Sequence, residues 1–113
     1  MRFESEVISK KLLPAVRSIL STKLKDDYGF KQTEIGRRLG ITQAAVSNYL
    51  NRGRADQEIV EKLLNDPQIS ILLDDAAGKA AQAEDFSGEI SEVLRNVRDK
   101  GLMKKHFKDA RKL

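Results

Sequence analysis

Residues 32–50 read QTEIGRRLGITQAAVSNYL and contain the pattern that decides the fold. Ile35 and Leu39 are four residues apart, so they share one face of a helix. Gly36 has no side chain and permits the close approach of a second helix, and Gly40 can take the positive φ that a tight turn requires. The stretch therefore predicts two short helices joined by a glycine turn, which is a helix-turn-helix.

The second helix of this motif divides into an inward face and an outward face. Ile41 would fix the turn to the core, and Thr42 can cap the helix. The inward residues are Val46, Tyr49 and Leu50, and the outward residues are Gln43, Ala44, Ser47, Asn48 and Asn51. Amide and hydroxyl side chains of this kind can hydrogen-bond to base edges in the major groove of DNA. The pattern predicts a helix that reads double-stranded DNA.

The motif resembles the helix-turn-helix of the Cro/λ-repressor-like family of transcriptional regulators. The resemblance rests on the small Gly36 after Ile35, on Gly40 in the turn, and on Val46 and Tyr49 in the second helix. It implies an all-α DNA-binding bundle whose second helix enters the major groove.

A wider stretch, residues 7–52, resembles the N-terminal DNA-binding region of archaeal predicted regulators. The shared sequences are LPAVR at residues 13–17 and TQAAVS at residues 42–47. In several such proteins a ligand-binding domain follows. Here residues 67–113 are too few for such a domain, so the resemblance does not extend to an effector site, and no cofactor is expected.

The expected DNA contacts fall into two groups. The resemblance implies base contacts at the start of the second helix, from Thr42, Gln43, Ala44, Ser47 and Asn48. The residues that flank the motif are expected to meet phosphates, and they are Lys31, Gln32, Arg37, Arg38, Asn51, Arg52 and Arg54. The N–H groups at the helix start near Gln32 would add further donors. Lys31 stands where the family usually has a Ser or Thr cap.

The rest of the chain also has helical periodicity, with no strand of convincing alternation. Pro14 predicts a short first helix and a second helix that begins near it, with a kinked continuous helix as the alternative. Gly29 is expected to end that helix in a left-handed conformation. Further helices are predicted at residues 55–65 with Ile59, Leu63 and Leu64 inward, from Pro67 with Asp66 as its cap, from a Ser87 cap to Gly101, and around Leu102, Met103 and Phe107.

Charge is distributed unevenly along the 113 residues, which carry net +4. Residues 1–66 carry net +3, residues 67–92 net −5 and residues 93–113 net +6. The basic ends favour a polyanionic partner. With no cysteine, one histidine and no nucleophile with its base, we expect neither an enzyme nor a metal protein. No apolar stretch is long enough to span a bilayer, which favours a cytoplasmic protein.

Residues 1–66 are therefore interpreted as a helix-turn-helix DNA-binding domain, and residues 67–113 as a helical extension with a basic tail. The predicted function is a sequence-specific transcriptional regulator. The alternative is a protein-interaction module, such as an antitoxin or a transcription-machinery adaptor. A homodimer is expected because one recognition helix reads few base pairs. The interface between the two copies is expected within residues 67–103, chiefly at Leu72, Leu73, Ala76, Val93, Leu94 and Val97. The alternative is that these residues complete a monomeric bundle.

Overall fold

The computed structural model describes residues 2–51, 53–107 and 110–111. The helices are α1 (Glu4–Val7), the π-helical η1 (Ile8–Leu12), α2 (Leu13–Asp26), α3 (Gln32–Leu39), α4 (Gln43–Leu50), α5 (Gln57–Asn65), α6 (Pro67–Ala81), α7 (Ser87–Lys100) and α8 (Lys104–Phe107). Two two-residue strands, β1 (Arg2–Phe3) and β2 (Ala110–Arg111), pair in parallel. The predicted all-α fold is confirmed.

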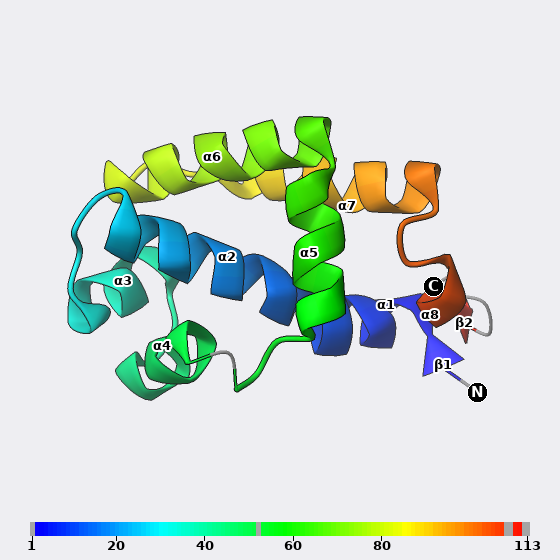
Figure 1. Cartoon of the computed structure of the whole chain (residues 1–113), viewed down its shortest axis with the longest axis horizontal. Helices are drawn as coiled ribbons and strands as arrows, with labels where there is room; N and C mark the ends of the chain where they lie inside the picture. Colours follow the sequence, from blue (N-terminus) through cyan, green and yellow to red (C-terminus); the bar gives the residue numbers. More distant parts are fainter. Residues whose placement is uncertain (1, 52, 108–109, 112–113) are drawn as a thin grey trace.

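Helix α2 is the centre of the bundle. It contacts α3, α4, α5 and α6, and α6 in turn packs along α7. In Figure 1, α6 and α7 form the upper long side of the molecule, α3 and α4 lie at its lower left, and α5 crosses in front. Helix α4 is therefore on the side of the bundle opposite α7.

The hydrophobic core joins the two halves of the chain. Its larger cluster includes Val7 and Leu12 near the N-terminus together with Leu73, Val93 and Met103. A smaller cluster beneath the helix-turn-helix contains Leu24, Ile35, Val46 and Ala80. The residues after position 66 thus pack around the same core as those before it.

The prediction of a homodimer interface is wrong for most of its residues, because they are buried within a single chain. Leu73, Ala76 and Val93 have no exposed surface, and Val97 is 1% exposed. Leu72 and Leu94 are half-buried against the same cluster. These apolar faces are used within one chain, because α2, α6 and α7 together need them to close the core.

The helix around Pro14 follows the alternative of a continuous helical path. Leu12 and Leu13 both have right-handed helical φ and ψ, and the N–H of Leu13 donates to the carbonyl of Ile8. That π-type hydrogen bond widens the turn directly before the proline ring, which would otherwise clash with the carbonyl one turn earlier. Gly29 has φ of 69° and ends the segment as predicted.

Two further predictions need correction. Leu64 is 41% exposed and does not face the core, whereas Ile59 and Leu63 do. Ser87 does not cap α7. It is the first residue of that helix, and its N–H and hydroxyl both donate to the carboxylate of Asp85. The predicted cap of the preceding helix, α6, is confirmed, because the carboxylate of Asp66 accepts the N–H of Ile69 at 3.0 Å.

Within the part of the chain that the structure describes, no helix has the length and apolarity needed to cross a bilayer.

Candidate nucleic-acid interface

The turn between α3 and α4 is locked by two glycines. Gly40 ends α3 with φ of 70° and ψ of 33°, which is the left-handed region. The N–H of Ile41 donates to the carbonyl of Gly36 at 2.9 Å. A Cβ on Gly36 would lie only 2.7 Å from the carbonyl oxygen of Ile41. The neighbour that requires glycine at position 36 is thus the backbone of the turn, and this contact fixes how α4 leaves α3.

The inward face of α4 is anchored in the bundle. Val46 has no exposed surface and Tyr49 is 1% exposed. The hydroxyl of Ser18, in α2, donates to the carbonyl of Tyr49 at 3.2 Å. At the other end, the hydroxyl oxygen of Thr42 accepts the N–H of Ala45 at 3.0 Å and caps the helix. Each end of α4 is therefore held in place by a hydrogen bond.

The outward face of α4 carries a row of short polar side chains. Gln43, Ala44, Asn48 and Asn51 are exposed, and Ser47 is half-buried. All the residues expected outward from the sequence are thus at the surface of one helix. Thr42 is exposed as well, and although its oxygen accepts the capping N–H, its hydroxyl hydrogen can still be donated to a base or phosphate.

The start of α3 presents uncapped backbone donors. Lys31 precedes the helix in an extended conformation and makes no side-chain cap, as the sequence indicated. Lys31 and Thr33 are exposed, and Gln32 is half-buried. Amide groups at a helix start favour an anion such as phosphate. Thr33 was not among the predicted site residues, although its position in the first turn of α3, beside these N–H groups, could have indicated it.

Arg37 and Arg38 are less free than the sequence indicated. Both are paired with Glu34 in the preceding turn, through hydrogen bonds of 3.0 Å from Arg37 and 2.7 Å from Arg38. The three side chains line a pocket of about 590 Å³ whose other wall is formed by residues 83–85. Glu34 was not among the predicted site residues, although its spacing to both arginines could have indicated the pairs.

Arg54 lies just beyond the end of α4. Its guanidinium carbon is 5.1 Å from the centre of the Tyr49 ring, and the residue is exposed. The cation–π contact positions a charged group beside the C-terminal end of the helix. The N–H of Gly53 donates to the carbonyl of Asn48 at 2.8 Å, which keeps this segment against α4. Arg52, also expected to meet phosphate, lies outside the described residues.

Comparison with known families gives one finding for this region. Residues 22–73 match the family model for the helix-turn-helix, a range that covers all of α3, α4 and α5. The match supports a DNA-binding helix-turn-helix of the Cro/λ-repressor type, and it says nothing of archaeal regulators. Neither the curated proteins nor the solved structures gave a significant match to the chain.

Proposed function

We propose that this protein is a transcriptional regulator that binds specific sequences of double-stranded DNA through α4. The observation that carries the proposal is the division of α4 into a buried face and an exposed polar face. Val46 and Tyr49 hold the helix in the bundle, while Gln43 and Asn48 are exposed. A helix fixed in this way can enter a major groove without the entropic cost of ordering it on binding.

Base reading is assigned to the outward residues of α4. The amides of Gln43 and Asn48 can each make two hydrogen bonds with an adenine edge, and the methyl group of Ala44 suits a thymine methyl. Ser47 and the hydroxyl of Thr42 complete the set. Short side chains along the row support this assignment, because they let the helix backbone approach the base edges closely.

Phosphate contacts are assigned to the two flanks of α4. On one flank are Lys31, Gln32 and the uncapped N–H groups that begin α3. On the other are Asn51 and Arg54, which follow α4 directly. Contacts on both sides of the recognition helix would set its register in the groove, since phosphate contacts position a protein without reading sequence.

The homodimer remains part of the proposal, on the argument that one α4 reads too few base pairs for a regulator. The interface between the two copies must differ from the one predicted from the sequence, because most of those residues are buried. Among the described residues, the large apolar side chains at the surface include Ile71 at 62% exposed and Leu64 at 41%. The same two side chains favour the alternative of a protein-interaction module, in which they would contact a different protein.

The deciding experiment is selection of bound sequences from a pool of random duplexes by the full chain, followed by competition. We expect a recurrent sequence that binds at least about a thousandfold more tightly than random duplex at physiological salt. A palindromic consensus would support the homodimer. Enrichment of no sequence, with weak binding that salt abolishes, would contradict sequence-specific recognition.

A further inference from the structure

The two adjacent arginines of α3 have different surroundings. The side chain of Arg37 is 75% exposed and pairs with one oxygen of Glu34 at 3.0 Å. The side chain of Arg38 is 26% exposed and pairs with the other oxygen of Glu34 at 2.7 Å. The guanidinium carbon of Arg38 also lies 5.4 Å from the centre of the Phe30 ring. Arg38 is thus held by two contacts in a half-buried position, and Arg37 by one contact in solvent.

The two arginines differ in what they lose by leaving Glu34. An exposed pair three residues apart on a helix contributes little, because water screens it and both side chains lose freedom in forming it. A DNA phosphate offers Arg37 an equivalent charge-assisted hydrogen bond. Arg38 would have to give up a half-buried ion pair together with its stacking on Phe30. Exchange of partners is therefore easy for Arg37 and costly for Arg38.

The surroundings of the pocket add to this difference. Glu84 and Asp85 line this pocket together with Glu34 and the two arginines. The negative charge of these carboxylates disfavours a phosphate inside the pocket, so the more exposed Arg37 is better placed than Arg38 to meet a phosphate outside it. Arg37 is four residues after Thr33, so these two side chains share a face of α3, and both are exposed.

We propose that Arg37, and not Arg38, is the arginine of α3 that contacts DNA phosphate, and that Glu34 is a positioning residue. In the free protein Glu34 holds both arginines. On DNA it stays with Arg38 and releases Arg37. This assignment rests on the proposed DNA binding, and it divides two residues that the sequence alone places in one group.

The test measures affinity for a random-sequence DNA duplex across a range of salt concentrations, with full-length variants. Arg37→Gln is expected to flatten the slope of log affinity against log salt by about one, with a loss of about five- to tenfold near 0.1 M salt. Arg38→Gln is expected to leave the slope unchanged. Glu34→Gln is expected to strengthen binding about two- to fivefold, because it removes a negative charge close to the phosphates.

Glu92→Gln is the matched control, because Glu92 pairs with Arg95 at the same three-residue spacing on α7, away from α4. It should change neither slope nor affinity. Thermal melting checks that each variant is folded, and Arg38→Met, which keeps an unbranched apolar side chain at this position, replaces Arg38→Gln if the latter melts without cooperativity.

Equal flattening by the Arg37 and Arg38 variants, or none by Arg37→Gln, would overturn the assignment while the wild-type binding still stands. A wild-type chain that binds no duplex at low salt would overturn the proposed function as well. Weaker binding by Glu34→Gln would show that Glu34 supports the interface and does not restrain Arg37.

Discussion

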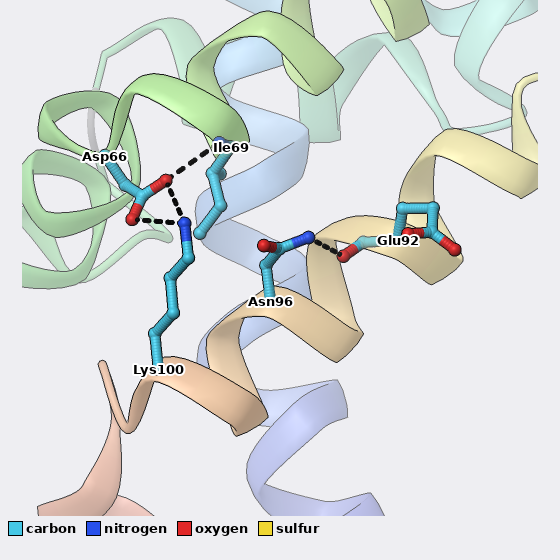
Figure 2. Close-up of polar contacts among 5 residues, drawn as sticks. All are labelled: Asp66, Ile69, Glu92, Asn96 and Lys100. Carbon is cyan, nitrogen blue, oxygen red and sulfur yellow. Dashed lines mark hydrogen bonds and ion pairs between the residues drawn. The ribbon is translucent and has the colours of Figure 1, made fainter.

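The side-chain nitrogen of Lys100 lies 3.0 Å from each carboxylate oxygen of Asp66 and so joins the end of α7 to the start of α6 (Figure 2). The same Asp66 accepts the N–H of Ile69 at 3.0 Å and caps α6. The hydrogen bond from Ile69, followed by that from Lys100, holds the pKa of the Asp66 carboxyl below its usual range. One carboxylate therefore fixes both a helix start and the packing of two helices.

Acid should weaken the fold through Asp66. Its folded-state pKa is depressed, so its stabilisation is complete above the unfolded-state value of about 3.9 and is lost as pH falls through the lower folded-state value. Melting temperatures of the wild type and Asp66→Asn, compared from about pH 6 to about pH 3, test this. Asparagine can still cap the helix, so the variant should lose less on acidification. Parallel acid profiles would contradict the role given to this carboxylate.

Two buried serines of α2 should respond to alanine in opposite directions. The Ser21 hydroxyl is fully buried and has no hydrogen-bond partner among the residues that the structure describes, whereas that of Ser18 donates to the Tyr49 carbonyl. Ser21→Ala is expected to raise the free energy of unfolding by up to about 1 kcal/mol, and Ser18→Ala to lower it by about 1 kcal/mol. Urea unfolding measures both. A loss at Ser21 as large as that at Ser18 would mean that the hydroxyl has a partner in solution.

Gly36→Ala should damage the turn that orients α4. Its Cβ would meet the Ile41 carbonyl at 2.7 Å, and backbone cannot move aside as a flexible side chain can. We expect a loss of about 1–3 kcal/mol in stability. Gly88→Ala is the control, since nothing lies within 4 Å of its Cβ position in α7, and it should stabilise by about 0.5–1 kcal/mol. Equal melting temperatures for wild type and Gly36→Ala would show that the turn can relax.

Gln43→Ala tests base reading by α4. We expect a loss of about 1–3 kcal/mol on the selected sequence and little change on random duplex, because a bidentate contact to a base is lost. Gln68→Ala, which removes an exposed amide from α6, is the control and should change neither affinity. If both DNAs lose equally, Gln43 positions the protein and does not read bases.

The helix-turn-helix was predictable because its constraints are local. Gly36, Gly40, Thr42 and Val46 each have a role that spacing alone reveals, since a turn and two helix faces involve neighbours in the chain. The exposed row of α4 followed from the same periodicity. The pairs that Glu34 makes were also local, and only the comparison of exposure between Arg37 and Arg38 required the structure.

The arrangement after residue 66 was not predictable in the same way. Periodicity shows that Leu73 and Val93 lie on apolar faces, but it does not say which surface covers them. The N-terminal Val7 and Leu12 contribute to that cover, although they are far from it in sequence. The prediction that Ser87 caps α7 failed for a different reason. The carboxylate of Asp85, two residues earlier, accepts both the N–H and the hydroxyl of Ser87, so Ser87 becomes the first residue of the helix.

The last prediction uses two residues of α6 to distinguish a side chain that stabilises the core from one that could contact a second copy of the protein. Leu73 has no exposed surface, and Ile71, two residues earlier, is 62% exposed on the other side of the helix. Leu73→Ala is expected to cost about 2–5 kcal/mol of stability, whereas Ile71→Ala should change it by less than about 0.5 kcal/mol. Sedimentation equilibrium completes the test. If copies associate through the exposed side, Ile71→Ala lowers the average mass while the Leu73 variant, under conditions where it stays folded, does not. A Leu73→Ala chain that melts like wild type but has a lower mass would restore the interface predicted from the sequence.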